Sequence, residues 1–152
     1  MPEQMYPKLH HVGIVVRDID RAGSDNSAYF GLGDLVGRFT MQTDNALYRG
    51  KRVSYAAEFG FIELGNILLE LIQPVGSDPS PYFDALSEHG EMTHHLAYVV
   101  PSINEHLGTA RKAGASLSIL LEDDLPKGDG RFAYVEGLVH GVLAELIELQ
   151  GS

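Results

Sequence analysis

Two histidines and two glutamates have the residue types of a divalent-metal site and stand at matching positions in two similar halves of this chain. His11 and His95 each follow another histidine, open matching apolar runs and stand 84 residues apart (95 − 11). Glu70 and Glu145 stand 75 residues apart (145 − 70) in two matching leucine-rich runs. Imidazole and carboxylate groups together suit borderline or hard divalent ions. We therefore predict one ion held by these four residues, with positions left open for a substrate.

Three carboxylates stand at notable positions in the predicted strands. Glu70 and Glu145 lie at the centres of apolar runs, where an unpaired carboxylate is costly and a cation would stabilise it. Pairing about the hairpin turn Gly65-Asn66 puts a third carboxylate, Glu63, on the face that carries Glu70. Glu63 is a further candidate, either as a ligand, as a general base at the cleft mouth, or as a plain surface residue.

Three other histidines lie close to these positions in the sequence. Strict alternation along a strand predicts that His10 and His94 point away from the cleft, on the outer face or at an edge. His140 is in a loop that could overhang the site, although loop histidines are usually just exposed. Glu148 has the wrong parity relative to Glu145 and is predicted to point away.

The elements that must carry these residues follow one order in both halves of the chain. After a loose arm at 1–8, the first half is predicted as a strand, a helix and three strands, at 11–16, 21–30, 35–40, 52–64 and 67–73, with a loop at 42–51. A helix at 81–89 follows. The second half repeats the order at 95–100, 103–113, 116–121, 131–136 and 142–149, with an acidic loop at 122–130.

This repetition predicts an α+β fold. Two tandem βαβββ modules, at about 8–75 and 92–150, would form a curved mixed sheet around a metal-binding cleft. At 152 residues the whole chain, 1–152, is expected to be a single domain.

Composition narrows the classes of function. The chain has no cysteine, so nitrogen and oxygen atoms must hold any metal, and disulfides are excluded. A net charge of −10 argues against nucleic acid as a partner. No apolar run is long enough to cross a membrane, and the N-terminal residues do not form a secretory signal. We therefore expect a cytoplasmic protein that acts on a small molecule.

These motifs resemble the vicinal oxygen chelate superfamily, the glyoxalase, bleomycin-resistance and dioxygenase group, over essentially the whole chain. Within it the chain is most similar to methylmalonyl-CoA epimerases. The matching stretches are 10–16, 64–66 with 70–74, 80–81 leading to 89–91, 94–100 and 141–146. The metal positions of that family fall on His11, Glu70, His95 and Glu145. This His-Glu-His-Glu set also resembles the ligand set of bacterial glyoxalase I.

The resemblance implies an enzyme: a metal-dependent epimerase or isomerase that removes a proton next to the carbonyl of a small acid or an acyl-CoA thioester. It further implies a divalent ion (Co, Ni, Zn, Mn or Mg) that binds substrate oxygens and stabilises the enolate, and it implies a homodimer. A carboxylate then moves the proton, and we predict Glu145 or Glu70 as the catalytic residue in a combined ligand and base role, with Glu63 as the outside candidate. The chain departs from the family in two places. A third-strand acid/base carboxylate of some epimerases falls on Phe59, and the His-Pro-Lys turn before the last strand is replaced at 136–140.

Other members of the superfamily provide the alternatives. A glyoxalase I-type lactoylglutathione lyase would use the same four ligands, but the usual Asp-Pro-Asp-Gly turn is missing. Extradiol dioxygenases use two histidines and one glutamate, and their chains are usually about twice as long. Non-catalytic members bind ligands in the cleft and typically lack the metal-binding residues, all of which are present here.

Overall fold

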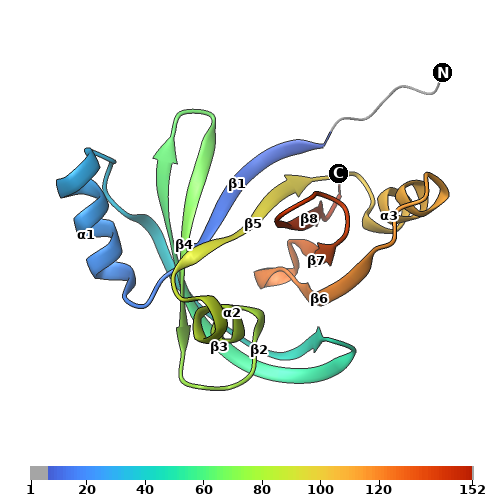
Figure 1. Ribbon diagram of the computed structural model, residues 1–152, viewed down its shortest axis with the longest axis horizontal. Coiled ribbons are helices and arrows are strands. Elements are labelled where there is room, and N and C mark those ends of the chain that lie inside the picture. Colours follow the sequence, from blue (N-terminus) through green and yellow to red (C-terminus); the bar gives the residue numbers. More distant parts are fainter. Residues whose placement is uncertain (1–6, 152) are drawn as a thin grey trace.

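A computed structural model describes residues 7–151, in which eight strands close into a barrel and three helices pack outside it (Figure 1). The α+β fold predicted from the sequence is confirmed. The elements in chain order are β1 (Lys8–Val15), α1 (Ile19–Phe30), β2 (Val36–Tyr48), β3 (Lys51–Leu64), β4 (Ile67–Val75), α2 (Pro81–His89), β5 (Met92–Val99), α3 (Ile103–Lys112), β6 (Ser118–Asp124), a 3₁₀ turn η1 (Pro126–Gly128), β7 (Gly130–Glu136) and β8 (Leu143–Leu149).

The strand order is the same in the two halves of the barrel. It runs β1-β4-β3-β2 in the first half and β5-β8-β7-β6 in the second. β1 pairs with β4 in parallel, β5 pairs with β8 in parallel, and the antiparallel pair β1–β5 joins the halves along one seam. The opposite seam, β2–β6, is short and pairs Leu47 with Glu122 and Tyr48 with Leu121. The two strands that begin with a His-His pair are therefore neighbours.

The hairpin β3–β4 has the register that its turn predicted. Leu64 pairs with Ile67, Glu63 with Leu68 and Phe61 with Glu70 about Gly65-Asn66. Because side chains alternate along a strand, this register puts Glu70 on the same face as the aromatic residue opposite it.

The loop predicted at 42–51 is largely strand, and the loop predicted at 122–130 is strand at its ends. Residues 42–48 continue β2, and 122–124 continue β6. Polar side chains dominate both segments, but β2 buries Thr43, Ala46 and Tyr48 on its inner face. Pairing with β3 satisfies its backbone hydrogen bonds, so cross-strand contacts outweigh weak strand propensity. Residues 1–6 of the arm predicted at 1–8 lie outside the described residues, and Lys8 is already the first residue of β1.

Caps rather than propensity define the helices. The Asp18 side chain accepts a hydrogen bond from the Arg21 amide, and Gly31 ends α1 in the left-handed conformation, at φ 76°. Ser80 and Ser102 cap α2 and α3 in the same way as Asp18.

A side chain from the last strand of each half ties the helix of the same half to the barrel. The amide of Ile19, the first residue of α1, donates to Gln73 Oε1 at 2.8 Å, and the amide of Ile103, the first residue of α3, donates to Glu148 Oε1 at 2.8 Å. Glu148 therefore points away from the barrel interior, as its parity relative to Glu145 predicted. The internal repeat extends to these individual contacts.

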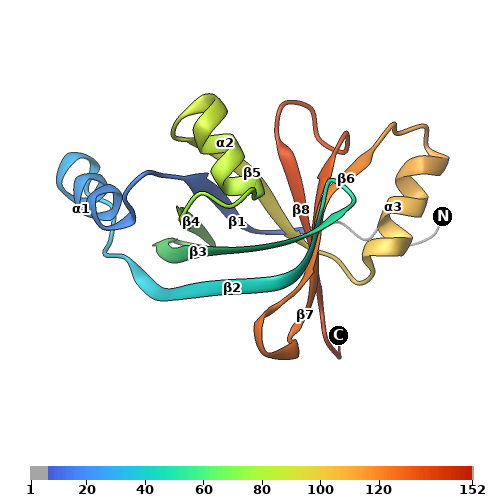
Figure 2. The ribbon, with the colours of Figure 1, turned by 90° about the horizontal axis from the view of Figure 1, so that it is seen from below.

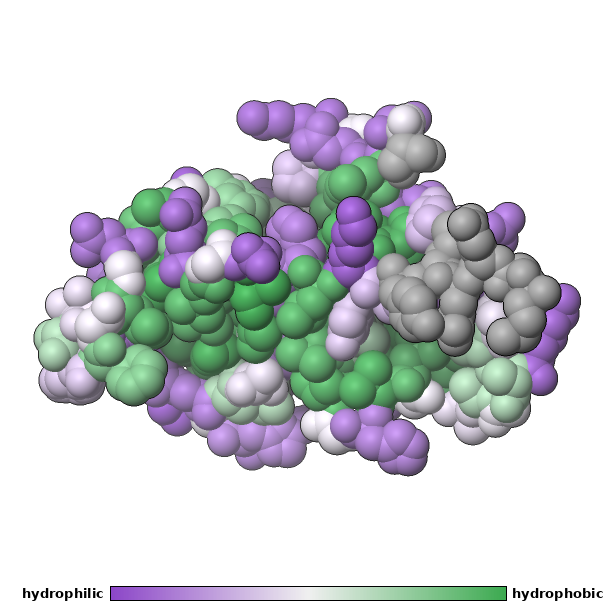
Figure 3. Space-filling model, turned by 90° about the horizontal axis from the view of Figure 1, so that it is seen from above, coloured by the Kyte–Doolittle hydropathy of each residue, from purple (hydrophilic) through white to green (hydrophobic). Residues whose placement is uncertain are grey.

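Figures 1 and 2 show α1 and α3 at opposite ends of the long axis, each covering the outer face of its own half-sheet. Ile19 packs there with Ile62 and Leu71, and Ile103 packs with Val135 and Leu146. The barrel interior holds a separate cluster that includes Tyr55, Phe59, Ile72, Tyr82 and Tyr134. On the face shown in Figure 3, apolar residues form a band along the molecule between polar borders. No helix within residues 7–151 has the length and apolarity needed to cross a lipid bilayer.

Candidate metal centre

Four side chains from four strands converge inside the barrel. His11 (β1), Glu70 (β4), His95 (β5) and Glu145 (β8) are each at most 6% exposed. The His11 Nε2 atom lies 3.2 Å from His95 Nε2 and 3.1 Å from Glu145 Oε1. Glu70 Oε1 lies 3.4 Å from both imidazole nitrogens, and Glu145 Oε1 lies 3.2 Å from His95 Nε2. The fold thus brings together all four residues that the sequence suggested as ligands.

The sheet register explains this convergence. Gly13 on β1 lies opposite His95 on β5 in the seam between the halves. In the parallel pair β1–β4, Glu70 lies opposite Gly13, and in the parallel pair β5–β8, Glu145 lies opposite Ala97. Gly13 and Ala97 each follow a candidate histidine by two residues, so each glutamate shares a face with the histidine of its own half.

Two β-bulges orient the remaining histidines. His10 in β1 and His94 in β5 have no partner residue on the neighbouring strand. A bulge adds one residue to a strand and redirects the side chains beside it. The prediction that both residues point away from the cleft is therefore wrong. His94 is 3% exposed and packs against Tyr82 and Tyr134, and His10 lines the cavity.

Each bulged histidine holds its neighbour by a ring-to-ring contact. The Nδ1 atoms of His10 and His11 are 2.8 Å apart, as are those of His94 and His95. In such a pair one ring donates and the other accepts. When His11 and His95 donate through Nδ1, their Nε2 atoms keep the free lone pairs that a metal requires, and both rings are fixed in orientation.

Gly13 leaves the space that the His95 ring occupies. A Cβ atom on Gly13 would lie 2.2 Å from Cε1 and 2.4 Å from Nε2 of His95. Any larger residue would displace the imidazole, so the glycine is needed for the ring position rather than for backbone freedom.

The metal-free centre is strongly polarised. Burial lowers the pKa of His11, but Glu145 and Glu70 outweigh burial and raise it to about 10. Burial and the same carboxylates act on His95, whose pKa is also raised. Burial raises the pKa of Glu145, but His11 and His95 outweigh it and lower the pKa to about 2, and they lower that of Glu70 too. At neutral pH both carboxylates of the metal-free centre are therefore ionised.

The donor set fits a divalent cation. Glu70 Oε1 and Glu145 Oε1 are buried and have no hydrogen-bond partner, although imidazole nitrogens lie close to both. Their contacts therefore have the separation of a hydrogen bond without its alignment. Adjacent ligand atoms around an ion with bonds of about 2.1 Å stand roughly 3.0 Å apart in an octahedron and roughly 3.4 Å apart in a tetrahedron. Donor atoms of His11, Glu70 and His95 all lie within 4.8 Å of one another.

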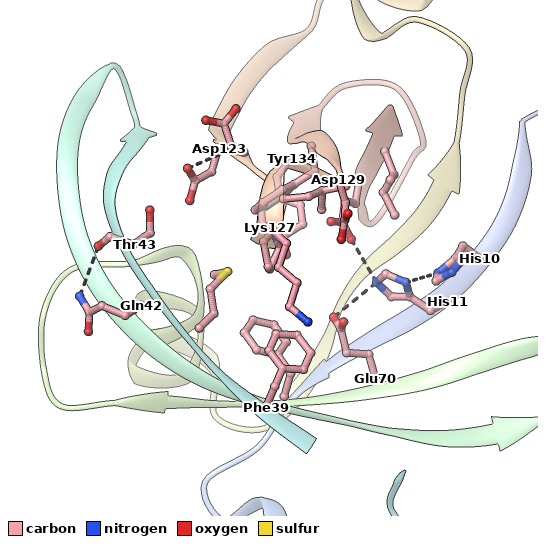
Figure 4. A pocket seen from close by; sticks show the side chains of 18 of the residues that line it. His10, His11, Phe39, Gln42, Thr43, Glu70, Asp123, Lys127, Asp129 and Tyr134 are labelled. Atoms are coloured by element: carbon pink, nitrogen blue, oxygen red, sulfur yellow. Dashed lines mark hydrogen bonds and ion pairs between the residues drawn. The ribbon is translucent and has the colours of Figure 1, made fainter. Parts of the chain in front are cut away.

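A cavity of about 940 Å³ opens beside this centre (Figure 4). Phe39, Phe59 and Phe61 form one wall, where the Phe39 and Phe59 rings stack at 5.0 Å and an angle of 10°. Tyr82 and Tyr134 line another part, with hydroxyl oxygens 2.6 Å apart. Burial raises the pKa of both tyrosines, so the pair is neutral. The cavity therefore offers an apolar wall, neutral hydroxyls and a charged inner end.

Other sequence candidates lie away from the centre. Glu63 is exposed near the β3–β4 turn and does not line the cavity. His140 is exposed and does not line it either. Phe59, at the position where some epimerases carry a carboxylate, contributes an aromatic ring to the wall.

Some cavity residues were not identified from the sequence. Tyr82 lies in a helix whose sequence shows only ordinary helix signals, and the contact with Tyr134 joins residues 52 positions apart. Lys127 lies in a segment predicted as a loop, and it reaches the cavity because β6 and β7 extend that connection. The sequence signal that could have identified Lys127 is that it is the one lysine or arginine in the acidic stretch 122–130.

The comparisons with known proteins agree with this architecture. A family model described as the glyoxalase/bleomycin resistance protein/dioxygenase superfamily matches residues 10–134. No curated protein matches the chain in sequence.

Three solved structures illustrate the shared fold. A hypothetical protein from Bacillus halodurans is 23% identical, with a TM-score of 0.73 and coverage of 97% of this chain and 98% of its own. The methylmalonyl-CoA epimerase of Mycobacterium tuberculosis is 22% identical, with a TM-score of 0.67 over 93% of this chain and 87% of its own. A Streptomyces coelicolor methylmalonyl-CoA epimerase variant, in complex with 2-nitronate-propionyl-CoA, is 19% identical, with a TM-score of 0.68 over 97% of both chains.

Proposed function

Since the chain belongs to the glyoxalase/bleomycin resistance protein/dioxygenase superfamily, as its sequence predicted, we propose that it is a metal-dependent epimerase or isomerase. Its substrate would be a small acid or an acyl-CoA thioester from which it removes the proton next to a carbonyl. Members of this superfamily are mostly enzymes and typically bind a divalent metal. The observation that carries the proposal is the buried convergence of two imidazoles and two carboxylate oxygens without hydrogen-bond partners.

We propose His11, Glu70, His95 and Glu145 as the metal ligands. A divalent ion held there supplies Lewis acidity for the negative charge that develops on a substrate oxygen. The protein residues orient that chemistry: the paired histidines fix the ring positions, and the phenylalanine wall excludes water from one side of the cavity.

Glu145 or Glu70 would take the α-proton. Both carboxylates are ionised and lie on the cavity lining. A carboxylate that binds through one oxygen keeps the other for a proton, which allows a combined ligand and base role. Glu63 lies outside the cavity and is given no role, and Phe59 cannot act as a base.

Proton exchange tests the reaction. We expect the metal-loaded protein to exchange the α-proton of methylmalonyl-CoA or of methylmalonate for deuterium, as followed by NMR in D₂O. The His95→Ala variant should lose the metal, keep its fold and show no exchange. The exposed His140→Ala variant, which makes the same change away from the cavity, should match the wild type.

The result distinguishes this function from its alternatives. No exchange above background with either compound would reject the epimerase. Isomerisation of the methylglyoxal–glutathione adduct would identify a glyoxalase-type lyase instead. A His95→Ala variant that keeps full metal affinity would show that the ligand set is wrong.

We also infer that the protein forms a homodimer, because the superfamily is often dimeric. Sedimentation equilibrium should give about twice the chain mass of 16.6 kDa. A single-chain mass at micromolar concentration would contradict this inference.

A further inference from the structure

One lysine reaches into the cavity from the connection between β6 and β7. Lys127 is the middle residue of the turn η1, and among the described residues that line the cavity it is the one lysine or arginine. Figure 4 shows its side chain extending toward the cavity centre, on the side of His11 and Glu70. Within residues 7–151 no carboxylate forms an ion pair with its ammonium group. The charge is therefore directed into the cavity without a protein partner.

The backbone at this residue is unusual. Lys127 has φ 61° and ψ 20°, in the left-handed region that residues other than glycine, asparagine and aspartate rarely adopt. Two hydrogen bonds hold the turn: the Asp129 amide donates to the Pro126 carbonyl, and the Leu125 amide donates to the Gly130 carbonyl. The exposed lysine side chain contributes nothing to the core in exchange. Backbone strain that no packing offsets is typical of functional sites.

The charge around Lys127 defines what it can bind. A divalent ion would balance Glu70 and Glu145, so Lys127 leaves the inner end of the cavity with one excess positive charge. Four aspartates also line the cavity: Asp44, Asp123, Asp124 and Asp129. One carboxylate can pair with Lys127, whereas a chain of phosphates would meet the like charge of these aspartates.

We propose that Lys127 is a substrate-positioning residue that pairs with the carboxylate of a compact carboxylic acid, and that this acid enters without CoA or another phosphate-bearing carrier. The inference rests on the proposed function and narrows its substrate to the small-acid class. The carbonyl side of the acid faces the four-residue centre, and its apolar part lies on the phenylalanine wall.

A ligand and mutation cycle isolates the contact. The probes are 2-oxobutyrate and its uncharged methyl ester, titrated by calorimetry into the Co²⁺-loaded protein. Lys127→Met keeps the side-chain length and removes the charge. It should weaken binding of the acid about tenfold and leave the ester within about twofold, because a charge-assisted pair is lost for the acid alone. Lys127→Arg, which keeps the positive charge, should restore most of the affinity for the acid that Lys127→Met loses.

The control is Lys51→Met, which makes the same change at an exposed lysine that does not line the cavity. It should bind both probes as the wild type does. Lys127→Asn, which tolerates the left-handed backbone, repeats the test if the methionine variant is unstable.

Each result is decisive. Equal weakening of acid and ester, or no binding of the acid to the wild type, would overturn the role of Lys127. Free CoA that binds as tightly as the acid would overturn the exclusion of a phosphate-bearing carrier. Failure of deuterium exchange would reject the reaction and leave the Lys127 coupling measurable, so the two proposals fail independently.

Discussion

Replacing Gly13 by alanine should damage the centre through one steric contact. The new Cβ atom would lie 2.2 Å from the His95 ring, where ordinary contact begins at 3.4 Å, so the ring must retreat by at least 1.2 Å (3.4 − 2.2). Metal–nitrogen bonds are about 2.0–2.1 Å long and tolerate deviations of only a few tenths of an ångström. We expect the metal affinity to fall at least about 100-fold, which corresponds to about 2.7 kcal/mol.

The assay separates this effect from general destabilisation. Metal affinity is measured by competition with a chromogenic chelator, and the free energy of unfolding is measured by urea denaturation in EDTA. Overpacking should cost the metal-free protein about 1–3 kcal/mol.

Gly108→Ala is the matched control for this substitution. Gly108 lies in α3 with nothing within 4 Å of the added atom. Its alanine variant should keep full metal affinity and gain up to about 1 kcal/mol in stability. If folded Gly13→Ala protein binds metal within about threefold of the wild type, the reasoning about the His95 position is refuted.

Four further predictions follow from the site and its supports. Metal affinity should rise from pH 6 to pH 9, because the pKa of His11 is raised to about 10 and a proton must leave this residue when the metal binds. Calorimetry in two buffers of different ionisation enthalpy should detect the released proton. An affinity that does not change with pH would contradict this prediction. The stability of the metal-free protein depends on pH in the opposite direction and should fall as the pH rises above 6.5. The raised pKa of His11 contributes stability that is complete below pH 6.5 and is lost as the pH rises through about 10. The lowered pKa of Glu145 contributes stability that is complete above pH 4.5 and is lost as the pH falls toward about 2. Urea denaturation at a series of pH values should therefore place the maximum free energy of unfolding between pH 4.5 and 6.5. Tyr134→Phe should cost about 1–3 kcal/mol, because it leaves the buried Tyr82 hydroxyl without its partner, and a neutral result in thermal unfolding would mean that the pair is not formed. Ser80→Ala should lower the free energy of unfolding by about 1 kcal/mol, because the N-cap of α2 is lost. The control is Ser77→Ala, which makes the same change at an exposed serine outside the helices and strands. Equal melting temperatures for the two variants would exclude the stabilising role of the cap.

The internal repeat made most of the architecture predictable. The His-His strands, the helix caps at Asp18 and Ser102 and the Gly65-Asn66 turn are local signals, and each depends on residues close together in sequence. The turn alone determines which residue faces Glu70. The repeat then implied that the second half copies the first, which is how a poor helix-forming sequence at 21–30 was still predicted as helical.

The errors come from contacts between distant parts of the chain. The bulges at His10 and His94 exist only in the pair β1–β5, whose strands are separated by most of the first half, so alternation gave the wrong direction for both side chains. The second part of β2 reads as a polar loop because its strand character depends on pairing with β3. Lys127 and Tyr82 reach the cavity through the same kind of long-range placement.

The symmetry of the fold separates the chemistry from substrate selection. Glu70 pairs across the sheet with Phe61, and Glu145 occupies the matching position opposite Tyr134. The repeat keeps an aromatic ring beside each carboxylate, but only the ring of the second half, that of Tyr134, carries a hydroxyl group. The four converging side chains retain the twofold pattern, as the proposed metal site requires, because an ion is indifferent to which half a ligand comes from. The walls have no such constraint, so the phenylalanines of the first half and Lys127 of the second can diverge to recognise two different ends of one substrate.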